Sequence, residues 1–175
     1  MSYYIYDIDG TLADTTARQH FVRNTSGAKK DWKSFFHAQN MLADSPNEHT
    51  VNIAQKLLSH CRIEPVYCTG RPDNLRSVTI EWLETHVEND HVKMGLDDYF
   101  VHGLGVHRNI EPINDRLFMR QSNDHRDDNV VKPELVRQII EKYGKPLAMF
   151  EDRDRVVRAV RAMGVPVFQV ADGDF

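Results

Sequence analysis

The chain has 175 residues, of which 41% are hydrophobic and 27% are charged. These values are typical of one globular domain with a substantial core, and they exclude a disordered chain. The net charge of −4 argues against a protein that coats DNA through a broad positive surface, although it allows a local phosphate-binding site. No apolar run approaches the roughly 20 residues that span a bilayer, and no secretory signal opens the chain, so we expect a cytoplasmic protein without a membrane segment.

The first predicted element is a buried strand over residues 3–8, an aromatic and β-branched run. It ends at two carboxylates in alternate positions, Asp7 and Asp9, and then at Gly10, which allows a sharp turn. Carboxylates at the end of a buried strand are unfavourable unless they meet a cation or take part in chemistry. A lone D-x-D also fits a strand with a solvated acidic edge, so the choice depends on downstream motifs.

The next segment, residues 15–44, combines basic and aromatic side chains with few acids. Its basic and aromatic members include Arg18, Arg23, Lys29, Lys30, Lys33, Phe21, Trp32, Phe35 and Phe36. This composition is typical of a surface that meets nucleotides through phosphate contacts and base stacking. It also fits a small helical subdomain with its own aromatic core and solvated lysines. Its place directly after the first acidic motif predicts an insertion that covers an active site.

Strands and helices alternate along the rest of the chain. Helices are expected at residues 45–59, 74–87, 133–143 and 155–163, the first of them opened by the capping-box order of Ser45, Pro46 and Glu48. Strands are expected at residues 63–68, 116–120, 147–150 and 165–170, with a further short strand at about residues 99–102. This alternation predicts an α/β fold, a parallel sheet with helices on both faces.

In such a sheet, ligands bind beyond the carboxyl ends of the strands. The loops at those ends carry Asp7, Asp9, Thr69, Arg71, Lys132, Glu151 and Asp152. Carboxylates beside a hydroxyl, a lysine and an arginine form a site for a divalent cation and a phosphoryl group, and Mg²⁺ prefers such oxygen ligands. A carboxylate nucleophile, a metal ion and phosphate-binding cations together indicate phosphoryl transfer.

The motifs resemble those of the haloacid dehalogenase (HAD) superfamily. D-I-D-G-T, T-G-R, Lys132 and the Glu151–Asp152 pair match its four motifs in order. The resemblance extends to the phosphatase half of bacteriophage polynucleotide kinase-phosphatases, whose R-x-x-x-D-x-R-x-D-x-x-V-K run matches residues 120–132. Their D-D-R-x-x-V-V string and terminal G-D-F match residues 151–157 and 173–175, with Glu151 replacing the first aspartate.

This resemblance implies one Rossmann-like HAD phosphatase domain over residues 1–175, with residues 15–60 as a small helical cap insertion after the first strand. Asp7 would attack the phosphorus to form an aspartyl-phosphate, and Asp9 would protonate the leaving ribose oxygen and then activate water. Phosphate or substrate would be bound by Thr69, Gly70, Arg71, Lys132, Arg18, Arg126 and Asp128, with Asp128 orienting a cation such as Lys132. Mg²⁺ would be held by Asp7, the Asp9 backbone carbonyl, Asp152 and Glu151, although the longer arm of Glu151 leaves its own part open.

The leading hypothesis is a Mg²⁺-dependent phosphomonoesterase that removes 3′-phosphates, or 2′,3′-cyclic phosphates, from nucleic-acid ends. Two alternatives stay open: the same chemistry on a free nucleotide or small phosphometabolite, and a non-catalytic binder of phosphorylated ends. No G-x-x-x-x-G-K-[ST] string occurs, so we expect no kinase domain within these residues. The choice of DNA or RNA, self-association and a separate kinase or ligase partner are not decided by the sequence.

Overall fold

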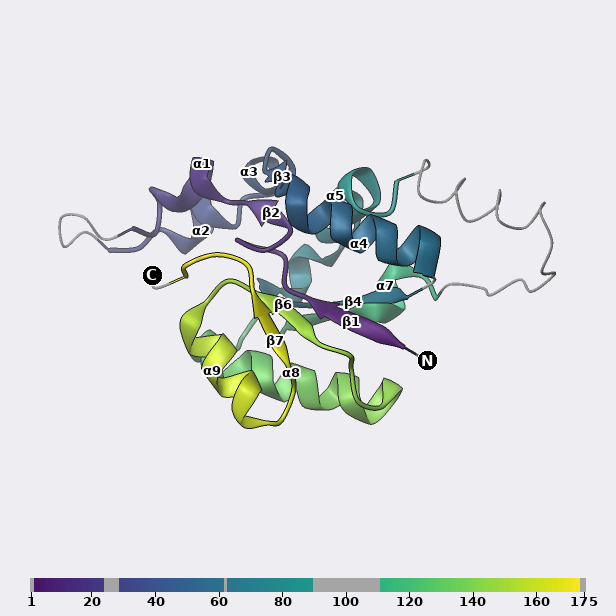
Figure 1. The fold of residues 1–175 in the computed structure, drawn as a ribbon. Helices are drawn as coiled ribbons and strands as arrows, with labels where there is room; N and C mark the ends of the chain where they lie inside the picture. Colours follow the sequence, from purple (N-terminus) through teal and green to yellow (C-terminus); the bar gives the residue numbers. More distant parts are fainter. Residues whose placement is uncertain (1, 24–28, 62, 90–110, 174–175) are drawn as a thin grey trace.

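A computed structural model of the protein describes residues 2–23, 29–61, 63–89 and 111–173 (Figure 1). Its centre is a five-stranded sheet of order β5-β4-β1-β6-β7, in which every neighbouring pair is parallel. The strands are β1 (Tyr3–Tyr6), β4 (Glu64–Pro72), β5 (Leu117–Arg120), β6 (Met149–Glu151) and β7 (Val167–Gln169). The expected α/β architecture is therefore confirmed. The strand expected at about residues 99–102 lies outside the described residues.

Helices cover both faces of the sheet (Figure 1). On one face lie α4 (Glu48–Cys61) and α5 (Arg76–His86), which follows the short 3₁₀ helix η1 (Asp73–Leu75). On the other face lie α8 (Asp128–Tyr143) and α9 (Asp154–Ala162), while α7 (Ile113–Arg116) leads into β5. Side chains alternate along β1, so Ile5 packs under α8 and α9 while Tyr6 packs under α4 and α5. None of the described helices is long and apolar enough to cross a bilayer.

The insertion after β1 forms three short helices, α1 (Thr16–Gln19), α2 (Trp32–Phe35) and α3 (Ala38–Leu42). At its base, β2 (Ala13–Asp14) pairs antiparallel with β3 (Ser45–Pro46). Figure 1 shows α1 and α2 beyond the carboxyl end of β1. The helix α4, which the expected cap of residues 15–60 includes, instead packs on the sheet through Val51 and Ala54, so it belongs to the helical layer.

Three element boundaries differ from the sequence expectation by three or more residues. The helix expected to open at Ser45 begins at Glu48, because Ser45 and Pro46 pair with β2 and the carbonyl of Asn47 accepts the first helical hydrogen bond. The helix expected from Pro133 begins at Asp128, so Lys132 lies within α8. The strand expected to end at Cys68 continues to Pro72, with an irregular register between Thr69 and Pro72.

Candidate active site

The turn after β1 brings the first acidic motif against the end of β6. Gly10 has a φ of +88°, and a Cβ atom there would lie 2.2 Å from Asp152 Oδ2. Only glycine allows the backbone to pass so close to that carboxylate. The Thr11 hydroxyl lies 3.5 Å from Asp7 Oδ2 and 3.4 Å from Asp152 Oδ1, so it can donate to either carboxylate. The first motif, which contains Asp7 and Thr11, and the last motif, which contains Asp152, are therefore in contact in the folded chain.

Four side chains form what we call the acid cluster: Asp7, Lys132, Glu151 and Asp152. One oxygen from each of the three carboxylates lies within 4.8 Å of the other two, and all three residues are buried. Lys132 Nζ lies 2.8 Å from Asp7 Oδ1 and 2.8 Å from Glu151 Oε2. The three buried carboxylates therefore outnumber the cations near them, which are Lys132, paired with Asp7 and Glu151, and Arg153, which also faces Asp128.

The pKa values of the acid cluster record this shortage of positive charge. Burial, followed by the charge of Glu151, raises the pKa of Asp7 to about 7. Burial likewise raises the pKa of Glu151 to about 7, and burial and Asp7 raise that of Asp152 to about 6. For Lys132, burial alone would lower the pKa, but its acidic neighbours outweigh burial and raise it. Such a site fits a divalent cation with oxygen ligands, which would offset the excess negative charge.

Glu151 differs from the other two carboxylates in its partners. Both of its oxygens accept hydrogen bonds from Lys132 Nζ, at 3.1 and 2.8 Å, and Oε1 also accepts one from the Arg153 backbone N–H at 3.1 Å. The longer glutamate arm thus reaches the lysine. Asp7 and Asp152 are therefore the stronger candidates for binding a metal ion.

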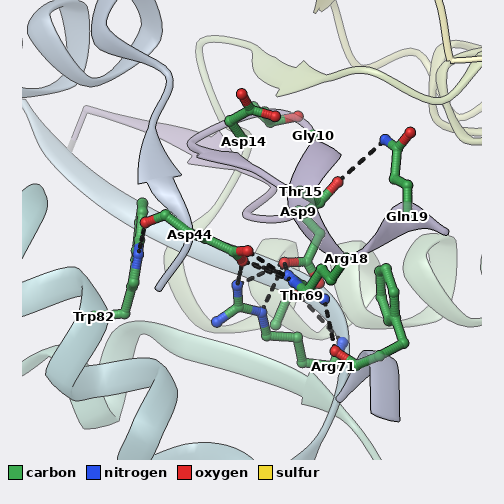
Figure 2. Close-up of polar contacts among 12 residues, drawn as sticks. Asp9, Gly10, Asp14, Thr15, Arg18, Gln19, Asp44, Thr69, Arg71 and Trp82 are labelled. Carbon is green, nitrogen blue, oxygen red and sulfur yellow. Dashed lines mark hydrogen bonds and ion pairs between the residues drawn. The ribbon is translucent and has the colours of Figure 1, made fainter. Parts of the chain in front are cut away.

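Beside the acid cluster lies an arginine cluster, formed by Asp9, Arg18, Asp44 and Arg71 (Figure 2). Arg71 donates to Asp9 Oδ1 from Nε at 2.9 Å and from Nη2 at 2.6 Å, and Arg18 Nη2 donates to the same oxygen at 2.6 Å. Burial alone would raise the pKa of Asp9, but the two guanidinium groups outweigh burial and hold it well below its usual range. Asp9 is therefore ionised in this arrangement.

Arg71 also carries a donor without a partner. It is fully buried, and among the described residues its Nη1 atom has no hydrogen-bond acceptor. Thr69, also buried, accepts a hydrogen bond from the Arg71 backbone N–H at 3.2 Å. Because a buried guanidinium nitrogen is normally paired, this one favours an incoming anion at the end of β4.

Asp44 is the partner that sequence reasoning missed. Its carboxylate accepts hydrogen bonds from Arg18 Nε at 2.9 Å and from Arg18 Nη2 at 2.6 Å, and its carbonyl accepts one from Trp82 Nε1 at 2.9 Å (Figure 2). The Phe35 carbonyl accepts from Arg18 Nη1 at 3.2 Å. Arg18 is thereby fixed between Asp44 and Asp9. In the sequence, Asp44 is a single acid at the end of the insertion, and no local pattern marks it.

Asp128 lies against the backbone of Gly70 but has other partners than expected. It accepts hydrogen bonds from Arg120 and Arg153, whereas Lys132 pairs with Asp7 and Glu151. Arg120 Nε also donates to the Gly70 carbonyl at 3.0 Å, and a Cβ atom on Gly70 would lie 2.9 Å from Asp128 Oδ1. Asp128 therefore orients two arginines. Arg120 and Arg153 both belong to motif strings matched in the sequence, and this membership was the sequence signal that they lie near the site.

Arg126 is the expected substrate-binding residue that the structure does not bring to either cluster. Its side chain is 52% exposed and pairs with Asp124 and Glu134, each at 2.7 Å. These pairs hold the loop before α8 against its first turns. A direct contact with substrate therefore stays a prediction.

A cleft of about 620 Å³ opens beside Gly10 and Asp152. Its described lining also includes Asp14, Gln19, Arg23, Asn47 and His49, from the insertion and the start of α4. The volume lies within the range typical of small-molecule sites. A ligand in the cleft would contact the acid cluster at Asp152.

Comparison with known proteins decides the family. The family model for the polynucleotide kinase PNKP phosphatase domain matches residues 1–175. The chain belongs to this family. It is therefore a phosphatase of the HAD superfamily, in agreement with the resemblance in the motifs. A search of curated protein sequences found no match.

Solved structures show the same fold. A Pnkp1/Rnl/Hen1 RNA repair complex contains a chain with a TM-score of 0.63 and 23% identity, over 99% of this chain and 43% of that chain. A haloacid dehalogenase-like hydrolase from Streptococcus pneumoniae gives a TM-score of 0.58 at 12% identity, over 97% of this chain and 84% of that chain. A HAD-superfamily hydrolase from Geobacter sulfurreducens gives 0.55 at 16% identity, over 97% and 89%. The present chain spans less than half the length of the RNA repair protein.

Proposed function

We propose that the protein is a Mg²⁺-dependent phosphomonoesterase that removes 3′-phosphates from nucleic-acid ends. The observation that carries the proposal is the contrast in contacts between Asp7, which lies among two other buried carboxylates, and Asp9, which accepts hydrogen bonds from Arg18 and Arg71. Such a pair supports a nucleophile and a separate proton carrier. The family match over the whole chain supports the same chemistry.

In the proposed reaction, Asp7 attacks the phosphorus and the bond to the ribose 3′ oxygen breaks, which leaves an aspartyl-phosphate. Asp9 gives a proton to the departing oxygen, and then takes one from the water that hydrolyses the intermediate. Lys132 holds Asp7 Oδ1 at 2.8 Å and so fixes the attacking group. Thr69 and Arg71 bind the phosphate oxygens, with the unpaired Arg71 Nη1 as one donor.

Asp9 must carry a proton to act as an acid, although two arginines keep it ionised in the substrate-free site. Phosphate oxygens compete for the guanidinium groups of Arg71 and Arg18. When the substrate draws these donors away, the pKa of Asp9 rises toward the range in which it can carry a proton. Binding of the phosphate thereby prepares the proton donor.

The acid cluster fits Mg²⁺ because its three buried carboxylates outnumber the two cations that face them, Lys132 and Arg153. Asp7, Asp152 and the Asp9 backbone carbonyl would hold the ion. When bound, the ion would supply positive charge that keeps Asp7 ionised and neutralises the phosphate. Glu151 acts through Lys132, whose ammonium group it positions.

The nucleic-acid substrate is supported by the family description and by a structural neighbour described as an RNA repair complex. For the same reason we expect the protein to act beside other end-repair enzymes, such as a separate kinase or ligase.

The test measures phosphate release from three substrates, with Mg²⁺ and with EDTA: an oligonucleotide 3′-phosphate, its 5′-phosphate isomer and a 3′-mononucleotide. We expect Mg²⁺-dependent release that is fastest from the oligonucleotide 3′-phosphate. Rapid hydrolysis of the mononucleotide without hydrolysis of the oligonucleotide would instead assign the enzyme to free nucleotides. Binding of phosphorylated ends without turnover would leave the non-catalytic alternative.

A further inference from the structure

The insertion carries an aromatic group that is only partly buried. Trp32 is 44% exposed, although its ring packs edge-on against Phe35 at 5.7 Å and nearly parallel to Phe36 at 5.9 Å and 18°. Phe35 and Phe36 contact each other edge-on at 4.9 Å. The indole is thus held in a fixed orientation while nearly half of the residue faces solvent. A flat, rigid and exposed ring is what a stacking ligand requires.

Lysines flank Trp32 in the sequence, and one of them lies over its ring. Lys29, Lys30 and Lys33 are all exposed, and Lys30 Nζ lies 5.5 Å from the centre of the Trp32 ring. The one acid among them, Asp31, accepts hydrogen bonds from the Ser34 backbone N–H at 3.0 Å and from its hydroxyl at 2.6 Å, so it is engaged at the start of α2. In a chain with a net charge of −4, this local excess of lysine is complementary to phosphate groups.

The same short helix reaches into the active site. Phe35 is buried, its carbonyl accepts a hydrogen bond from Arg18 Nη1 at 3.2 Å, and its ring centre lies 4.2 Å from the Arg18 guanidinium carbon. Arg18 in turn donates to Asp9 at 2.6 Å (Figure 2). Trp32 lies three residues before Phe35 and four before Phe36, so the three rings pack together on neighbouring positions of one turn. Phe35 therefore connects the exposed Trp32 ring directly to Arg18 of the arginine cluster.

We propose that Trp32 and the lysines beside it, Lys29, Lys30 and Lys33, form a docking surface for single-stranded nucleic acid. The base of the terminal nucleotide stacks on Trp32, and the lysines contact the phosphates that precede it. This inference rests on the proposed function and names the part of the substrate, beyond the phosphate, that the enzyme recognises. An unpaired base offers a free face for stacking, which a base inside a duplex does not.

The surface favours a nucleic acid over an acidic peptide because it combines charge with a planar ring. Lysines alone attract any polyanion. Base stacking on an aromatic side chain adds an attraction that tolerates every sequence, because every base has a flat face. The surface therefore predicts binding of single strands with little dependence on base identity.

The first experiment needs no variant. Wild-type enzyme is given two single-stranded oligonucleotide 3′-phosphates that differ only at the last nucleotide, which carries a base in one and is abasic in the other. We expect kcat/KM to be roughly tenfold lower for the abasic substrate, mainly through KM, because stacking is lost. Equal kcat/KM values for the two substrates would overturn the proposal.

The second experiment tests the ring itself. For Trp32→Ala, the ratio of kcat/KM for the base-containing oligonucleotide to that for an aryl phosphate should fall roughly tenfold. Trp32→Phe should restore much of the ratio. The matched control is Phe168→Ala, which removes an aromatic side chain that is 55% exposed on β7 and also packs on a neighbouring ring, Phe150, at 5.2 Å. An equal fall in the control would overturn the assignment to Trp32.

A binding measurement separates this proposal from the proposed activity. Fluorescence anisotropy of a labelled decamer that ends in a 3′-hydroxyl reports docking without turnover. We expect Lys30→Ala/Lys33→Ala to raise its Kd several-fold, and Lys56→Ala, an exposed lysine of α4, to leave it unchanged. Retained binding in an enzyme that releases no 3′-phosphate would refute the activity alone. Absence of binding, or equal competition by polyglutamate, would overturn the docking surface.

Discussion

Asp7 and Asp9 lie two residues apart, yet the acid cluster and the arginine cluster shift their pKa values in opposite directions. In the acid cluster, one lysine faces three buried carboxylates, and the pKa of Asp7 rises to about 7. In the arginine cluster, two guanidinium groups converge on one oxygen of Asp9 and lower its pKa. The first environment favours an added cation, and in the second the unpaired Nη1 of Arg71 favours an added anion. A divalent ion and a phosphate therefore complement the two clusters together.

The largest effect should come from removing the carboxylate of Asp7. The variant Asp7→Asn keeps the shape of the side chain but removes the attacking oxygen, so we expect phosphate release to fall by on the order of 10⁴-fold or more. Steady-state turnover of an aryl phosphate measures the loss, and circular dichroism checks that the fold persists. A near-normal rate would rule out the covalent mechanism.

The roles of Asp152 and Glu151 in the acid cluster can be distinguished by how the activity of each variant depends on the Mg²⁺ concentration. We expect Asp152→Asn to raise the Mg²⁺ concentration for half-maximal activity on the order of 10- to 100-fold, because it removes a carboxylate that we propose binds the metal ion. Glu151→Gln should lower kcat through Lys132 while the Mg²⁺ requirement stays nearly constant. A titration of activity with Mg²⁺ makes the comparison. Equal shifts for both variants would make Glu151 a ligand of the metal ion as well.

In the arginine cluster, Asp44 should prove to be a positioning residue. The variant Asp44→Asn removes the charge that holds Arg18, and we expect a loss of about 3 kcal/mol in the free energy of unfolding together with a reduced kcat. Asp31→Asn is the control, because that residue is exposed in the same insertion and caps α2. Urea denaturation and turnover measure both effects. If Asp44→Asn and Arg18→Lys have additive effects on kcat, Asp44 does not act through Arg18.

The smallest effect concerns stability and pH. Without metal, Asp7, Glu151 and Asp152 have pKa values above those of the unfolded chain, so the folded state binds more protons between about pH 4 and pH 7. Their contribution to the free energy of unfolding is therefore greatest at the acidic end of this window and is lost as the pH rises through it. Folding lowers the pKa of Asp9, so its contribution to the free energy of unfolding increases as the pH rises. This increase occurs only below about pH 4, where the unfolded aspartate titrates.

Thermal melts in EDTA should accordingly give a Tm about 3 °C higher near pH 5.5 than near pH 7.5. Added Mg²⁺ should raise Tm more at the higher pH, where the carboxylates are ionised. The Asp7→Asn variant should show a smaller difference between the two pH values. A higher Tm near pH 7.5 in EDTA would contradict the charge excess of the acid cluster.

The strands and the residues at their ends followed from the sequence because the signals are local. A buried apolar run that stops at Asp7, at Thr69 or at Glu151 is visible in a few neighbouring residues. The α/β arrangement then places these ends on one edge of the sheet. The assignment of roles to individual residues came from the family resemblance, and it stays a proposal.

The partners of those residues depend on contacts between distant parts of the chain, which local patterns do not record. Asp44 lies 26 residues from Arg18, and the sequence gives no reason to pair them. The start of α8 at Asp128 was not predicted, because the residues just before Lys132 are mostly charged or polar and show no helical periodicity of apolar residues. The family resemblance implied a substrate contact for Arg126, whose charge in this structure is matched by Asp124 and Glu134 on the surface.

The close approach of Gly10 to Asp152 determines how late in synthesis and folding the active site can be completed. The first acidic motif is made early in synthesis, but its companion carboxylate follows about 140 residues later, after four of the five strands have been translated. Contacts of such long sequence separation form late, because the intervening chain must first be ordered. A nascent chain that lacks β6 therefore has the proposed nucleophile, Asp7, without Asp152, its proposed metal-binding companion, and without Glu151, the partner of Lys132. Recovery of activity during refolding should then report the docking of the last strands, later than the formation of helical structure.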